Sequence, residues 1–226
     1  MKALLWKDFR VNLPIIVAAV FIWLAAHAIA AVSMIFFAAH HNRLDAESWV
    51  EILFRVSTAT FLFSQLLIGA LGANAMATER GDRSAEFLFY LPVTRQQMLA
   101  SKLLVALVVA VAIWLWHLLV LEIVCPVLSN VLHEERIPSY AVVVASGVSL
   151  FGAAWLASSF MRSTAYSLLA SLALFGAIGA AFFNSVQSWN WPPEGTREPW
   201  FVGIHLTLGL VGYVAGTWYF TRRVEP

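Results

Sequence analysis

The sequence contains very little charge and almost no cysteine. Only 12% of its 226 residues are Asp, Glu, Lys or Arg and 61% are hydrophobic, whereas charged residues make up about a quarter of a soluble domain. The single cysteine, Cys125, excludes an internal disulfide. The 14 basic and 13 acidic residues nearly balance, so the chain lacks the positive excess of a nucleic-acid-binding protein and we expect no such partner.

Two kinds of motif are also missing. The sequence has no Gly-x-x-x-x-Gly-Lys-Ser/Thr segment, which excludes nucleotide binding through a P-loop. It has no His-x-x-x-His or His-Glu-x-x-His spacing either, so we predict no metal site. The sequence therefore offers no sign that this chain itself is an enzyme.

Long charge-free runs are what the sequence does contain. A helix that crosses the hydrocarbon core of about 30 Å needs about 20 apolar residues, and six charge-free runs are long enough. The chain is therefore predicted to be all-α, a single polytopic membrane domain over residues 1–226. We expect its transmembrane helices at residues 14–39, 55–78, 97–125, 139–160, 164–186 and 200–221.

The distribution of Lys and Arg predicts the orientation of these helices. One set of loops holds ten of these residues and the other set only four, Arg43, Arg55, Arg136 and Arg197. An excess of Lys and Arg marks the cytoplasmic side of a membrane. We therefore expect both termini in the cytoplasm.

Residues 1–13 have an amphipathic helical pattern that ends at Pro14. At 100° per residue, Leu5, Trp6, Phe9 and Leu13 fall on one face. This pattern favours a short helix that lies in the inner headgroup layer, with Pro14 opening the first span. The alternative is a cationic flank that only sets the topology.

The longest cytoplasmic connection, residues 79–96, contains two helix starts. Asp82 or Ser84 can cap a short helix that ends before Pro92, and Thr94 with Gln97 forms a capping box before the third span. The short helix carries an apolar cluster, residues 87–91, within a charged rim. Such a cluster either packs against the membrane or binds a groove on a cytoplasmic protein.

The same segment resembles the ABC-2 permeases of bacterial ABC transporters. The resemblance rests on Glu79-Arg80-Gly81, the aromatic and leucine run, Leu91-Pro92-Val93-Thr94-Arg95 and Lys102-Leu103-Leu104. Where the family often has a small or polar residue after its glycine, this chain has Asp82. The family's re-entrant hairpin before the last span is at best shortened in residues 187–199.

This resemblance implies an export permease in the inner membrane of a bacterial cell, coupled to a separate ATPase. In that family an elbow helix precedes the first span, and a coupling helix after the second span docks on the ATPase subunit. Two permeases, as a homo- or heterodimer, would work with two ATPase subunits, which would bind ATP and Mg²⁺ while this chain binds no cofactor. The implied docking residues are Glu79, Arg80, Arg83, Glu86, Phe87, Leu88, Phe89, Tyr90, Leu91 and Arg95.

Polar residues inside the predicted spans are candidates for the transport pathway. They are costly in hydrocarbon and usually face a bundle interior or water. Interhelical hydrogen bonding, or for Glu122 a place at the interface, is the alternative explanation. Two other functions also stay open: an intramembrane enzyme that uses Glu122 with His117 or His205, and an anchor or assembly factor without transport. The candidates are His27, Gln65, Asn74, His117, Glu122, Asn184 and His205.

Small residues are frequent in the last two spans. Gly212 and Gly216 form a Gly-x-x-x-Gly face, which lets two helix backbones approach closely in lipid. The partner of this face is either another helix of the same chain or a second copy.

Overall fold

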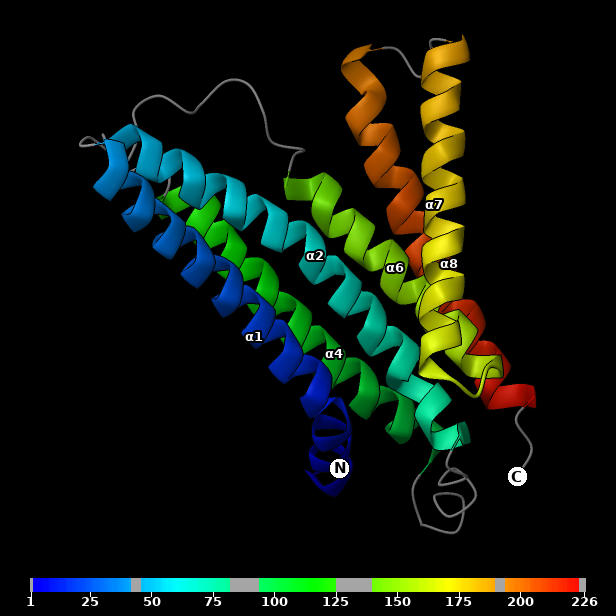
Figure 1. Cartoon of the computed structure of the whole chain (residues 1–226). Coiled ribbons are helices and arrows are strands. Elements are labelled where there is room, and N and C mark those ends of the chain that lie inside the picture. The colour runs from blue at the N-terminus through cyan, green and yellow to red at the C-terminus, as the bar shows by residue number, and fades with distance from the viewer. Residues whose placement is uncertain (1, 42–45, 82–93, 125–139, 190–193, 224–226) are drawn as a thin grey trace.

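The computed structural model describes residues 2–41, 46–81, 94–124, 140–189 and 194–223. These residues are almost entirely helical (Figure 1). A turn of π-helix, in which each bond spans one extra residue, continues α4 at its end. The elements are α1 (Lys2–His41), α2 (Ala46–Gly81), α4 (Arg95–Leu118), the π-helix η1 (Leu119–Val124), α6 (Tyr140–Phe160), α7 (Thr164–Trp189), the 3₁₀ turn η2 (Glu194–Thr196) and α8 (Arg197–Arg223).

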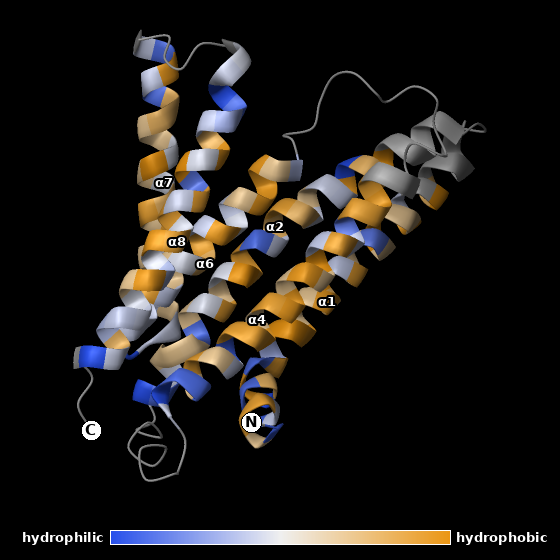
Figure 2. Cartoon of the chain, turned by 180° about the vertical axis from the view of Figure 1, so that it is seen from behind, coloured by the Kyte–Doolittle hydropathy of each residue, from blue (hydrophilic) through white to orange (hydrophobic). Residues whose placement is uncertain are grey.

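Six of these helices are long and apolar enough to cross a membrane. Each coincides with one of the charge-free runs, so the predicted count of six spans is confirmed. Apolar residues dominate the middle of α1 and α4, while polar residues gather near the chain termini (Figure 2). The chain is therefore a multi-pass membrane protein.

The helices form two groups that diverge from one end of the molecule. The first group is α1, α2 and α4, and the second is α6, α7 and α8 (Figure 1). Extensive packing between α2 and α6 joins them, whereas α4 barely touches α8. We call the end that holds both termini proximal and the opposite end distal; the two groups separate toward the distal end (Figure 1).

The tightest apolar core lies where four helices of both groups meet. Trp155 of α6 is fully buried, and its indole N–H donates to Thr217 Oγ1 of α8 at 3.2 Å. Met76 of α2, Leu99 of α4 and Phe220 of α8 pack in the same cluster. Because Leu99 and Phe220 lie near the proximal termini of their helices, this core closes the base of the two groups.

The first helix is longer than the predicted span, because α1 has no break at Pro14. It runs from Lys2 to His41 with Pro14 inside it. A proline in a helix removes one hydrogen bond and bends the helix, and the first turns of α1 run in a different direction from the rest (Figure 1). The separate elbow therefore appears as the bent start of α1, and its position in the headgroup layer stays a prediction.

The Gly-x-x-x-Gly face of α8 packs within the chain. A Cβ atom added to Gly212 would lie 2.6 Å from the carbonyl oxygen of Gly152 on α6, and one added to Gly216 would lie 2.9 Å from Leu156 Cα. Backbone carbonyls cannot move aside as flexible side chains do. The question that the sequence left open is thus answered: this face serves the contact between α6 and α8.

We expect Gly212→Ala to destabilise the protein by about 1–3 kcal/mol, the usual cost of forcing an extra carbon into a packed interface. Thermal unfolding in detergent measures the effect. Gly203→Ala, in the same helix, is the control because no atom lies within 4 Å of its added Cβ. Equal melting temperatures for the two variants would contradict the packing described for α6 and α8.

Candidate functional site

The predicted coupling helix lies outside the described residues, but both ends of its connection are described. Residues 82–93, which include the docking candidates Arg83, Glu86, Phe87, Leu88, Phe89, Tyr90 and Leu91, are not described. The docking role of these seven residues therefore stays a prediction. The end of α2 and the start of α4 show how the connection is held.

The start of α4 has the predicted capping box. Thr94 has an extended backbone, with φ −75° and ψ 150°, and its side-chain oxygen accepts a hydrogen bond from the Gln97 amide at 3.2 Å. The Gln97 side-chain oxygen accepts from the Thr94 amide at 3.1 Å. Both bonds satisfy amides that the helix leaves free at its first turn. The capping box therefore fixes where the connection ends and α4 begins.

A buried ion cluster holds the two ends of the connection together. Lys102 of α4 donates from Nζ to Glu79 Oε1 of α2 at 2.8 Å and to Asp8 Oδ1 of α1 at 3.3 Å. Lys7 also contacts Glu79, and the Ser101 hydroxyl donates to Asp8 Oδ2. Asp8, Glu79 and Lys102 are 3%, 4% and 7% exposed, so the protein itself shields them almost completely.

The charges in this cluster balance. Two carboxylates face two ammonium groups, of which Lys7 is the more accessible, with 31% of its side chain exposed. A buried charge costs several kcal/mol unless it is paired and hydrogen-bonded. The cluster is therefore a strict constraint on where α1, α2 and α4 lie relative to one another.

A chain of neutral hydrogen bonds extends the cluster toward α7. Asn12 donates to the Asp8 carbonyl, and Asn74 donates to Asn12 Oδ1, both at 2.9 Å. Thr164, the first residue of α7, donates to Asn74 Oδ1 at 3.2 Å. Asn74, a candidate for the transport pathway, lies among the polar contacts of the proximal end, and its role in transport stays a prediction.

Two arginines that flank the connection contact the second helix group. The Arg80 guanidinium donates to the carbonyl oxygen of Ser159 at the end of α6. The Arg95 guanidinium donates to the carbonyl oxygen of Thr221 near the end of α8 at 2.9 Å. Positive side chains are favourable at helix C-termini, where carbonyl groups are free. Both arginines therefore hold the connection against α6 and α8.

These contacts change what can be expected of three docking candidates. Glu79, Arg80 and Arg95 all have partners within the chain, and Glu79 is buried. These contacts position the two ends of the connection, and the docking role of the three residues stays a prediction. Sequence reasoning gave Asp8 no role and used Lys102 only as part of the family motif, because nothing local in the sequence pairs residues that are 94 positions apart.

The candidate histidines lie at two places, His27 and His117 near each other and His205 apart from them. His27 and His117 face α2, with ring nitrogens 3.4 Å from Ser57 Oγ and 3.5 Å from Thr60 Oγ1. His205 is buried between α7 and α8, stacked on Phe201 with its ring centroid 3.9 Å away. Within the described part of the chain, no group of three His, Cys, Asp or Glu residues could hold a metal ion. The side chain of Glu122 is not described.

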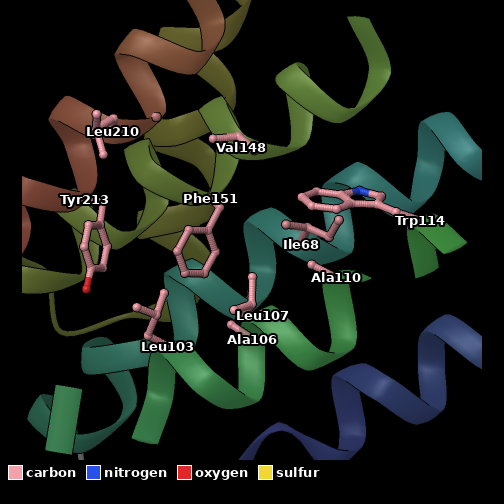
Figure 3. Close-up of a pocket in the computed structure, with 11 residues that line it drawn as sticks. Ile68, Leu103, Ala106, Leu107, Ala110, Trp114, Val148, Phe151, Leu210 and Tyr213 are labelled. Carbon is pink, nitrogen blue, oxygen red and sulfur yellow. The ribbon is translucent and has the colours of Figure 1, made fainter. Parts of the chain in front are cut away.

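Two apolar cavities lie along the spans. One of about 400 Å³ lies among α1, α2 and α4, with His117, Thr60 and Ser64 as polar lining. The other, of about 220 Å³, lies between the two helix groups (Figure 3). Its apolar lining comes from four helices and includes Ile68, Leu107, Phe151, Leu210 and Tyr213.

Six spanning helices with a polar proximal end define a polytopic α-helical membrane protein. The chain matches the family described as ABC-2 family transporter protein over residues 3–221, and it belongs to that family. It is thus a permease of the ABC transporters, whose transmembrane subunits are distinct from the ATPases with which the family generally works. No curated protein and no solved structure matches the chain.

We expect Lys102→Met to destabilise the protein by about 3–5 kcal/mol, because it leaves two buried carboxylates without their shared cation. Thermal unfolding in detergent measures the loss. Lys7→Met is the matched control and should cost less, since Lys7 is partly exposed and Lys102 still pairs with Glu79. Asp8→Asn should partly rescue Lys102→Met, because it removes one of the uncompensated charges. A Lys102→Met protein as stable as the native chain would show that the cluster is not a constraint.

Proposed function

We propose that this permease is the membrane-spanning half of an ATP-driven exporter and is driven by a separate ATPase subunit. The observation that carries this proposal is the anchoring of the 82–93 connection, whose two ends share a buried ion cluster. A connection held this firmly on the proximal side can transmit a push from a partner to the helices. Membership of the ABC-2 family supports the identity of that partner as an ABC ATPase.

The apolar residues of the connection are the proposed docking site. Phe87, Leu88, Phe89, Tyr90 and Leu91 form the predicted apolar cluster, with Arg83 and Glu86 in its rim. Large aromatic side chains dominate binding energy at protein interfaces when they enter a pocket on the partner. The cluster therefore binds a groove on the ATPase, while Glu79, Arg80 and Arg95 hold the base of the connection in place.

The complex would contain two permease chains and two ATPase subunits. ATP and Mg²⁺ bind to the ATPases, because this chain has no P-loop of its own. The proximal end then faces the cytoplasm of a bacterial cell, in agreement with its excess of Lys and Arg. The second permease chain completes a pathway through the inner membrane.

The ion cluster transmits a movement of the connection to the first helix group. Lys102 lies two turns into α4, and Glu79 lies near the end of α2, so both move when the connection moves. Asp8 ties the start of α1 to the same lysine. A shift of the connection is thus passed to α1, α2 and α4 together, while Arg80 and Arg95 carry it to the second group.

The two alternative functions have less support. An intramembrane enzyme would need Glu122 to act with His117 or His205. His205 belongs to the other helix group and is enclosed by aromatic rings, and Glu122 and His117 belong to no recognisable catalytic motif. A passive anchor would have no need of an ATPase. Membership of a transporter family favours transport over both alternatives.

We expect Phe89→Asp to abolish binding of the ATPase, because a carboxylate cannot enter an apolar pocket without losing its hydration. Co-expression with an ABC ATPase that co-purifies with the native chain, followed by affinity purification of the permease, measures the binding. Tyr166→Asp, at an exposed position at the start of α7, is the control and should leave the ATPase bound. If both variants retain the ATPase, the docking role of residues 82–91 is wrong.

We expect Asp8→Asn to weaken coupling between the ATPase and the helices by about fivefold or more, in the usual range of coupling between sites, without preventing binding. Spin labels at Ile29 of α1 and Leu210 of α8, both exposed, report the separation of the two helix groups in a Cys125→Ser background. ATP should shift this separation in the native complex and much less in Asp8→Asn. Arg10→Gln is the control, since Arg10 is exposed and contacts the Trp6 ring. An unchanged shift in Asp8→Asn would show that α1 is not driven through the cluster.

A further inference from the structure

A groove separates the first turns of α1 from α4 on the outer surface of the helix group. Its volume is about 460 Å³, within the range of about 300–1,000 Å³ that is typical of small-molecule sites. Trp6 and Val108 on its walls are 60% and 59% exposed, so the groove opens to the surroundings of the helices. Its lining includes Lys2, Leu5, Trp6 and Phe9 of α1 and Leu104 and Val108 of α4.

We propose that this groove binds one anionic phospholipid of the leaflet at the proximal end. The proposal does not depend on transport, because it needs only that the helices span a bilayer. A phospholipid has a charged headgroup at the membrane surface and acyl chains that point to the membrane centre. The groove has its charged and apolar parts in the same order.

The order follows from the direction of the two helices. Lys2 lies at the proximal tip of α1, and Phe9 lies seven residues further along the helix, about 10 Å away at 1.5 Å per residue. The lining residues of α4 continue this apolar wall away from the proximal end. A headgroup beside Lys2 therefore leaves its acyl chains along Trp6, Phe9 and Val108.

The charges that stay exposed beside the groove determine which headgroup it binds, and the ion cluster determines which charges stay exposed. Asp8 is the one acidic residue in the described part of α1, and it is buried against Lys102. The charges that remain exposed on the first turns, Lys2 and Arg10, are both positive, and Lys7 is partly exposed beside them. Arg10 also lies over the Trp6 ring at 5.6 Å, which keeps a cation beside the groove. Basic residues at a membrane surface attract anionic lipids.

The ion cluster therefore leaves the surface beside the groove positively charged. If Asp8 faced outward, its carboxylate would offset one of the cations and repel a phosphate group. Because Lys102 holds Asp8 inside, the surface beside the groove carries only positive charge among the described residues of these turns.

Native mass spectrometry of the full chain tests the proposal, with phosphatidylglycerol as the anionic probe and phosphatidylcholine of the same acyl chains as the neutral one. The native chain should retain one phosphatidylglycerol in preference to phosphatidylcholine. The double variant Lys2→Gln/Arg10→Gln should lose about fivefold of this preference for each cation removed. Equal retention of the two lipids by the native chain would overturn the proposal.

Matched variants test the location. Arg162→Gln/Arg222→Gln removes two exposed cations elsewhere, Arg162 between α6 and α7 and Arg222 of α8. Arg222 lies over the Trp218 ring at 5.6 Å, as Arg10 does over Trp6. This pair should keep the preference; a loss as large as that of Lys2→Gln/Arg10→Gln would show general attraction to basic residues and overturn the site. Val108→Trp should fill the groove and release the lipid, whereas Val111→Trp, on the same helix outside the groove, should not. A dimer that forms without bound lipid and is broken by Val108→Trp would assign the groove to a second copy of the chain instead.

Discussion

The contact on which the proximal end depends is the ion pairing of Lys102 with Asp8 and Glu79. Burying the ammonium group of a lysine that is 7% exposed costs several kcal/mol unless it is paired, and its two partners come from two other helices. Three helices must therefore meet at one point with little freedom in register. The hydrophobic effect could not fix the register of these helices, because in a bilayer an apolar side chain is as stable against lipid as against another helix.

This constraint gives the two ends of the molecule different properties. At the proximal end, polar contacts tie together helices of both groups, through Arg80 to α6, Asn74 to α7 and Arg95 to α8. Toward the distal end the groups separate (Figure 1), and an apolar cavity lies between them (Figure 3). Two helix groups that are joined at the proximal end and separate toward the distal end are suited to rocking against each other.

The sequence predicted the features that depend on residues close to one another along the chain. Charge-free runs gave the six spans because a bilayer excludes charge over about 30 Å, and Thr94 with Gln97 gave the start of α4 because both partners lie within one helical turn. Pro14 suggested a break that does not exist, since a bent helix satisfies its remaining hydrogen bonds within the chain. The ion cluster was missed because Asp8 and Lys102 are 94 residues apart. Only the packing of α1 on α4 brings them together.

Because α1 has few buried residues, the ion cluster is a main determinant of where this helix lies. Few residues of this helix are buried, and those near its start are Leu4, Asp8 and Asn12, two of which are polar. Further along, His27 contributes another polar contact, to Ser57. Directional bonds, rather than broad apolar packing, thus determine where α1 lies. A helix held in this way changes position when its polar partners move, and those partners lie at the base of the connection that the ATPase is proposed to push. The first helix is therefore the element of the fold whose position should respond most directly to that push.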